Sequence, residues 1–452
     1  MRVLIQLRPP QDVVASVLDP GVVSTVADVA GDLPGVLLDQ TFDPVPLPGL
    51  APMATPRSGG LLGSLGGSRL GLSRSAEHAS VLVRGEIADD DLPTRWNLLT
   101  STVREVTGVF SDPSIGTTLA CDGNVPVGDW HDVERLLHVG ELQANGYDGD
   151  GVRVAIVDGG INYEHVAGKL GRPCLIDGYN SWNPRGTEPD PGRYPVGHGS
   201  LCAFNTLIAA PKAVLLDIPI LRTLQSTTTG LLSDAVAAYA HLWQVLMNLP
   251  EASRTLVVSN SWGLNSRKDD LPPGHPGNYA GNPMHPFNVA LASLEVAGAD
   301  IVFSAGNGGQ DCPNSNRDAF YDIVGANGHP KAVTVAGVDI HGTRAGYSTK
   351  GPARLADNKP DISSYTHFLG SEATELRADT GTSTACPVAA GVIAALRTRH
   401  PGSHLFPSQL RTLLQRTAED RSTAGFDYEY GYGIINPPAL IAALDKFRQR
   451  AA

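Results

Sequence analysis

The chain has 452 residues, a formal net charge of −12 and an apolar content of 42%. That much apolar sequence can build a sizeable core in more than one domain. An acidic chain is poorly suited to bind nucleic acid, and no apolar run approaches the roughly 18 residues that a membrane-spanning helix needs. We therefore expect neither a nucleic-acid partner nor a membrane partner.

The cysteines and the N-terminal segment indicate in which cellular compartment the protein is expected. The five cysteines are odd in number and widely spaced, so neither a disulfide framework nor a cysteine zinc site is expected. The segment 1–10 resembles a strand followed by a turn, and it lacks the apolar core of about 7–15 residues found in a secretory signal. We expect a cytoplasmic location and leave export by another route open.

The N-terminal region shows one pattern twice. Strands are expected at 2–8 and 35–41 around a helix at 11–30, and again at 81–87 and 108–110 around a helix at 89–106. Between the two copies, 47–75 is rich in Gly, Ser, Pro and Leu and is interpreted as a flexible insertion. Two β-α-β units predict an α+β sandwich of the ferredoxin-like type.

From about residue 146, apolar strands alternate with helices, which is typical of a parallel α/β sheet. The segment 152–157 is almost continuously apolar, as expected of a strand covered on both faces. Further strands are expected at 255–259, 300–304 and 332–338. Helices are expected at 199–209, 231–249, 286–297, 384–399, 407–418 and 437–447.

Two polar residues of this region stand next to glycines at element ends. Asp158 follows the strand 152–157, and His198 lies between glycines at the start of a helix. Functional groups of open α/β sheets gather at the carboxyl ends of strands, and an exposed histidine can exchange a proton near neutral pH. Taken alone, each residue also fits a simpler interpretation, a turn aspartate and a loop histidine.

Asn307 and Ser383 occupy comparable positions. Asn307 follows the strand 300–304, and Ser383 lies between a Gly-Thr turn and a helix. A serine needs an adjacent base and a rigid mount to act as a nucleophile, and an amide at a strand end could donate to an oxyanion. Alone, Asn307 could be a left-handed turn residue and Ser383 a helix N-cap.

Together and in this order, these residues resemble the subtilisin-like serine proteases, the subtilase superfamily. The resemblance covers roughly 140–445 and differs from the usual motifs at Ser200, Thr384 and Cys386, where Thr, Met and Ser are common. It is carried by VAIVDGGI at 154–161, GHGS at 197–200, SNSWG at 259–263, GYSTKGP at 346–352, KPD at 359–361, GTSTACP at 381–387 and GYGIIN at 431–436.

The resemblance implies a serine endopeptidase that acts on proteins or peptides. Ser383 would attack the scissile carbonyl, His198 would transfer the proton, Asp158 would orient His198, and Asn307 would donate to the oxyanion. A peptide ligase or cyclase, or a leader peptidase, stays open because each would use the same acyl-enzyme. The implied substrate-binding residues are Ser261, Trp262, Gly263, Ser304, Ala305 and Gly306.

The expected organisation has three parts. A subtilisin-like α/β domain, with a parallel sheet and helices on both faces, occupies 136–452. The ferredoxin-like α+β region occupies 1–115, and 116–135 is a linker in which self-cleavage would occur. The resemblance implies that the N-terminal region is a pro-domain packed on the catalytic domain, whereas a fixed accessory or partner-binding domain is the alternative.

No cofactor is certain and no residue is assigned to a metal, although the resemblance makes calcium a candidate. The DGDG sequence at 148–151 looks like a cation loop but lacks the ligands that should follow, which favours a turn. Cys202 lies four residues after His198 on one helix face, where thiol-sensitive subtilases carry a cysteine. The alternative for Cys202 is a buried, packing side chain.

Overall fold

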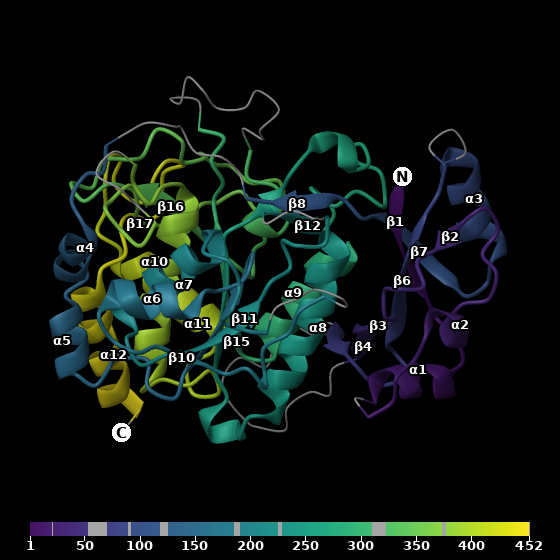
Figure 1. The fold of residues 1–452 in the computed structure, drawn as a ribbon, viewed down its shortest axis with the longest axis horizontal. Coiled ribbons are helices and arrows are strands. Elements are labelled where there is room, and N and C mark those ends of the chain that lie inside the picture. The colour runs from purple at the N-terminus through teal and green to yellow at the C-terminus, as the bar shows by residue number, and fades with distance from the viewer. Residues whose placement is uncertain are drawn as a thin grey trace. The chain divides into compact units, whose positions relative to one another are not determined.

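The computed structural model describes residues 1–19, 21–52, 70–88, 92–117, 125–184, 190–224, 228–309, 322–372 and 377–451. The chain divides into two compact units, Met1–Asp112 and Pro113–Ala452, whose elements are labelled in Figure 1. Over the described ranges, no helix is both long enough and apolar enough to cross a membrane.

The first unit is built on an antiparallel sheet with the strand order β2-β6-β1-β7, to which β3 adds by pairing with β6. Apolar side chains of the central strands fill its core, so that Ile5 and Leu82 are fully buried. Its elements are β1 (Arg2–Leu7), α1 (Gln11–Leu18), α2 (Val26–Val29), β2 (Leu37–Leu38), β3 (Val45–Leu47), β4 (Gly49–Pro52), β5 (Leu70–Ser73), β6 (Ser80–Glu86), α3 (Leu92–Thr102) and β7 (Val106–Ser111).

Two expectations for this unit need correction. The helix expected at 11–30 is in fact two short helices, because Gly21 follows α1 and Thr25 is the N-cap of a second helix, α2. Thr25 and Asp28 form a capping box, in which the Asp28 carboxylate accepts from the Thr25 N–H at 2.7 Å. The insertion at 47–75 is not irregular throughout, since β4 pairs with β5 in antiparallel register. Residues 53–69 lie outside the described part.

The second unit contains a parallel seven-stranded sheet with the order β10-β11-β9-β13-β15-β16-β17. Its strands are β9 (Arg153–Val157), β10 (Leu175–Ile176), β11 (Val214–Ile218), β13 (Leu256–Asn260), β15 (Ala299–Ser304), β16 (Val333–Val338) and β17 (Ile362–Tyr365). Its helices are α4 (Trp130–Leu136), α5 (Val139–Ala144), α6 (Tyr163–Leu170), α7 (His198–Ala209), α8 (Leu232–Asn248), α9 (Pro286–Val296), α10 (Thr382–Arg397), α11 (Pro407–Thr417) and α12 (Pro437–Ala451).

Helices cover both faces of this sheet (Figure 1). Successive side chains of a strand point to opposite faces, and β15 shows the consequence. Val302 belongs to the same core cluster as α7 and α10, whereas the Phe303 ring lies 5.2 Å from that of Trp262, which in turn contacts Phe287 of α9. The α/β architecture expected from the alternating strands and helices is therefore confirmed.

The boundaries of the predicted linker at 116–135 need correction. At its end, the Asp129 carboxylate caps α4 by accepting from the His131 and Asp132 N–H groups at 2.9 and 3.0 Å, and Val133 is fully buried in the core. At its start, Gly116 belongs to strand β8 (Ser114–Gly116) of the second unit. Ser114 and Ile115, which the sequence places in the first region, belong to the same strand. Residues 118–124 lie outside the described part.

Candidate active site

Three neighbouring strands bring the predicted site residues to one edge of the sheet. β9 pairs with β13, and β13 pairs with β15, all in parallel. Asp158, Ser261 and Asn307 follow the carboxyl ends of β9, β13 and β15 respectively. All three are almost completely buried, with exposed fractions of 1 to 3%. The predicted gathering of polar groups at this edge is what the fold produces.

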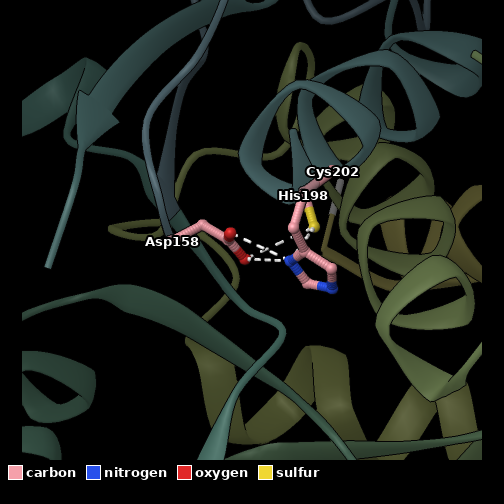
Figure 2. Close-up of side chains that lie close together, drawn as sticks. All are labelled: Asp158, His198 and Cys202. Atoms are coloured by element: carbon pink, nitrogen blue, oxygen red, sulfur yellow. Dashed lines mark hydrogen bonds and ion pairs between the residues drawn. The ribbon is translucent and has the colours of Figure 1, made fainter. Parts of the chain in front are cut away.

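Asp158 and His198 form a direct hydrogen-bonded pair. The Nδ1 atom of His198 lies 2.9 Å from each oxygen of the Asp158 carboxylate. His198 is the first residue of α7, and the Gly159 N–H also donates to Asp158 at 2.7 Å, which helps to hold the carboxylate in place. Figure 2 shows the carboxylate facing the imidazole ring.

The surroundings of His198 favour its charged form. Burial disfavours the imidazolium, but the adjacent Asp158 carboxylate, with Glu372 and Asp379 further out, outweighs this and raises the pKa of His198 above its ordinary value. The imidazole nevertheless keeps 20% of its surface exposed, so that it can exchange protons with a bound molecule.

The thiol of Cys202 lies inside the site, as Figure 2 also shows. Its sulfur is 3.5 Å from an Asp158 oxygen, 3.8 Å from His198 Nδ1 and 3.7 Å from the Ser383 carbonyl oxygen. Burial and the Asp158 charge raise the pKa of Cys202 well above its ordinary value, so the thiol stays protonated. Cys202 therefore packs between the Asp158–His198 pair and the backbone that carries Ser383.

Ser383 is the second residue of the buried helix α10, which begins at Thr382 and not at 384 as expected. Its hydroxyl donates to the Ser261 carbonyl at 3.3 Å, and the Ser261 hydroxyl donates back to the Ser383 carbonyl at 3.0 Å. Gly381, which precedes the helix, has φ = 87°, a conformation that side chains other than glycine rarely adopt. The serine is thus mounted rigidly at the positive end of a helix.

The Asn307 amide is oriented by Thr382. Its oxygen accepts from the Thr382 N–H at 2.8 Å and from the Thr382 hydroxyl at 3.0 Å, and that hydroxyl also accepts from Gly306 N–H at 3.0 Å. A Cβ atom at Gly381 would lie 2.9 Å from the Asn307 amide nitrogen. The amide N–H groups therefore lie beside the turn that leads into Ser383.

The segments expected to bind substrate flank these residues, but their side chains differ in role. The Trp262 indole is buried against aromatic rings of the core, so that only the backbone of this residue is placed for recognition. Ser304 and Ala305 are likewise buried. The Asn327 amide donates to the carbonyls of both Trp262 and Ser304 at 2.8 Å, which fixes the two segments against each other.

A short strand lies between two of these segments. Strand β8 pairs in antiparallel register with β14 (Gly263–Leu264) on one side and β12 (Thr229–Leu231) on the other. Gly116 is opposite Gly263, and a Cβ atom at Gly116 would lie 2.7 Å from the Thr228 carbonyl oxygen, so the strand is closely seated. This strand was not predicted from the sequence.

Several residues that support the site were not predicted. Thr382 and Asn327 are examples, and the buried Asp217 of β11 is another. Its carboxylate accepts from Gly192 N–H at 2.8 Å and Ile161 N–H at 3.2 Å, and so ties the segment after Asp158 to the one before His198. Burial raises the pKa of Asp217 to about 7.

Two groups of residues bear on metal binding. In the part of the chain that the structure describes, Asp158, His198 and Cys202 are the group close enough to hold an ion, but a nitrogen and a sulfur do not suit calcium, which prefers oxygen ligands. At 148–151, the Asp148 carboxylate lies 2.7 Å from the Lys212 ammonium and accepts from Asp150 N–H at 3.1 Å. These contacts are those of a turn, and no calcium ligand is assigned.

The sequence of the chain is also similar to those of known proteins. The family model described as "Subtilase family" matches residues 149–433, which is more than half of the chain. The chain is 28% identical over 310 residues to subtilisin DY of Bacillus licheniformis, with 67% of the chain and 96% of that protein aligned.

Two longer proteins are also similar. Bovine furin is 26% identical over 333 residues, which cover 68% of the chain and 39% of furin. A calcium-dependent protease of Trichormus variabilis is 25% identical over 333 residues, which cover 64% of the chain and 46% of that protease. The chain thus spans nearly all of subtilisin DY but less than half of the other two proteins. The chain belongs to the subtilase family, and its enzyme class is that of a subtilisin-like serine endopeptidase.

Proposed function

We propose that this protein hydrolyses peptide bonds with Ser383 as nucleophile, His198 as general base and Asp158 as the residue that orients His198. The observation that carries the proposal is the contact of His198 Nδ1 with both Asp158 oxygens at 2.9 Å. A carboxylate there keeps the proton on Nδ1, so that Nε2 is the basic nitrogen that can take a proton.

The proposed chemistry follows from these positions. The Ser383 oxygen bonds to the substrate carbonyl carbon while its proton passes to His198 Nε2, and His198 then gives that proton to the departing amine as the C–N bond breaks. Water attacks the acyl-enzyme with the same histidine as base, which releases the acid and restores Ser383. Asp158, nearly fully buried, stabilises the imidazolium throughout.

The pH dependence of the reaction should reflect the raised pKa of His198. The base form is the neutral imidazole, so kcat/KM should fall as the pH is lowered through this pKa, with a midpoint above the ordinary value of 6.5. The measurement is kcat/KM from about pH 5 to 9, with enzyme returned to about pH 8 as a control for denaturation. A midpoint below 6.5 would contradict the role given to Asp158.

Asn307 is proposed to donate to the oxyanion that forms on the substrate carbonyl. The orientation of its amide by Thr382 supports this role, since the oxygen is occupied and the N–H groups lie beside the turn before Ser383. Asn307→Ala should lower kcat by about 10²- to 10³-fold and change KM little, because the interaction strengthens only in the transition state. A rise in KM at constant kcat would instead indicate ground-state binding.

We further propose that β8 occupies the channel in which substrates bind and that the protein cleaves itself just beyond it. The strand runs antiparallel to β14, with Gly116 opposite Gly263. Counting two residues forward from Gly116 and two back from Gly263 in the sequence gives Thr118 and Ser261. Ser261 is the residue whose carbonyl accepts from the Ser383 hydroxyl. The bond between Thr118 and Leu119 is the predicted site of cleavage.

The region before this bond is proposed to be a removable pro-domain of the ferredoxin-like type. The elements β1, α1, β2, β6, α3 and β7 follow the order β-α-β-β-α-β, and the sheet order β2-β6-β1-β7 supports the assignment. The insertion that contains β3, β4 and β5 makes this region longer than the simple pattern.

Intact mass spectrometry of the purified protein and of Ser383→Ala tests self-processing. We expect the wild type to yield a chain that begins at Leu119, and the variant to stay intact. Ser383→Ala mixed with a trace of active wild type shows whether cleavage also occurs between molecules. A wild-type chain that remains whole while cleaving added peptides would contradict self-processing and leave the triad proposal standing.

A further inference from the structure

The first residue of β8 is held by side chains from a different part of the chain. Ser114 is buried, with 3% of its surface exposed. Its hydroxyl donates to the Asp269 carboxylate and accepts from the Asn265 amide at 3.5 Å, while its carbonyl accepts from Asn265 N–H at 3.0 Å. Asp269 and Asn265 therefore contact both the side chain and the backbone of one residue in the proposed substrate channel.

The segment that carries Asp269 is fixed by its own contacts. Asp269 ends the short 3-10 helix η3 (Arg267–Asp269), whose first turn is capped by the Ser266 hydroxyl, which accepts from Lys268 N–H at 3.2 Å. The carboxylate of the next residue, Asp270, organises the following loop. It accepts at 2.8–2.9 Å from the N–H groups of Leu271, Tyr279 and Ala280 and from the Asn278 amide.

The register gives Ser114 a defined place in a substrate. If the bond after residue 118 is cleaved, Ser114 is the fifth residue before that bond, Ile115 is the fourth and Gly116 the third. Ile115 is fully buried, and Gly116 is closely seated against Thr228. The fifth residue is thus the one whose side chain hydrogen-bonds to a carboxylate and an amide.

We propose that Asp269, assisted by Asn265, forms a subsite that selects serine or threonine as the fifth residue before the cleaved bond. This inference rests on the function proposed above. A hydroxyl can donate to the carboxylate and accept from the amide at once, as that of Ser114 does. An alanine could make neither hydrogen bond, and the partly buried Asp269 carboxylate would lose the donor that Ser114 supplies, which disfavours alanine at this position.

Competition between two peptides tests the subsite directly. One is Pro-Ser-Ile-Gly-Thr-Thr-Leu-Ala, the sequence of residues 113–120, and the other has alanine in place of its serine. The full-length protein, purified in active form, cleaves both peptides in one reaction, and mass spectrometry of the products gives the ratio of kcat/KM. We expect the serine peptide to be favoured by about tenfold, as for a hydrogen bond to a charged group.

The variants and outcomes separate the two proposals. Asp269→Ala should bring the ratio to about one, while Asp269→Asn, which keeps an acceptor oxygen, should retain part of the preference. Glu251→Ala removes one exposed acidic side chain from a different 3-10 helix and should keep the wild-type ratio. Equal cleavage of both peptides by the wild type, or an undiminished preference in Asp269→Ala, would overturn the subsite alone. Cleavage of the peptides at another bond would overturn both the proposed register and the subsite. Failure to cleave either peptide, by an enzyme preparation that still digests an unfolded protein, would do the same.

Discussion

Ser383→Ala is expected to lose peptide-bond cleavage almost completely, with kcat lower by about 10⁴- to 10⁶-fold. Alanine cannot form the acyl-enzyme, and the helix N-terminus and Asn307 that remain would only stabilise a slow attack by water. The fold should be unaffected, because the lost hydroxyl makes a single long contact of 3.3 Å to the Ser261 carbonyl. Such a contact contributes about 1 kcal/mol or less to stability.

The control for this variant is Ser293→Ala. Ser293 is another buried serine, and it lies on α9, the helix that covers the other face of the sheet. It should retain wild-type activity, and both variants should unfold at nearly the wild-type temperature. Turnover by Ser383→Ala within about tenfold of the wild-type rate would remove Ser383 from the reaction. A large loss in Ser293→Ala would show that the assay responds to packing rather than to chemistry.

Asp158→Asn should have the next largest effect, a loss of about 10⁴-fold in kcat at neutral pH. An asparagine can present an N–H group to His198 Nδ1, which would place the histidine proton on Nε2 and remove the lone pair that acts as the base. The variant keeps the shape of the site, since the side chain is the same size and the Gly159 N–H can still donate to an oxygen there.

Asp150→Asn is the matched control for this variant, because Asp150 is an exposed turn residue just before β9. It should retain full activity. The kinetics of Asp158→Asn should show a lowered kcat with little change in KM, since Asp158 is buried behind His198. An equal effect of both substitutions, or a loss confined to KM, would argue against an orienting role.

The four proposed catalytic positions could be predicted because each lies in a short local motif. Asp158 and Asn307 follow apolar strands, and His198 and Ser383 stand at helix starts next to glycines, so chain order and local pattern were sufficient. The parallel sheet followed from its apolar strands. The sequence did not predict the edge strands β10 and β17, which are only two and four residues long and too short for a pattern of periodicity. It also did not predict β11, a five-residue strand between β10 and β9.

The supporting residues could not be predicted, because their roles depend on contacts between distant segments. Thr382 acts through Asn307, 75 residues away, and Asn327 through Trp262, 65 residues away. Thr382 lies in the motif around Ser383, but the motif does not reveal its contact with Asn307, and nothing in the neighbouring sequence marks Asn327. Strand β8 could not be predicted for the same reason. Its three residues form a strand only because they pair with β12 and β14, which lie more than a hundred residues later in the chain.

The most direct measurement of the central claim is labelling with a fluorophosphonate, which reacts with a serine only when a neighbouring base activates it. The labelled wild-type protein would be digested and the modified residue identified by mass spectrometry. The triad predicts stoichiometric labelling at Ser383, with a parallel loss of peptidase activity, and no labelling of Ser383→Ala or Asp158→Asn on the same timescale. Labelling at another serine, or an active enzyme that takes up no label, would contradict it.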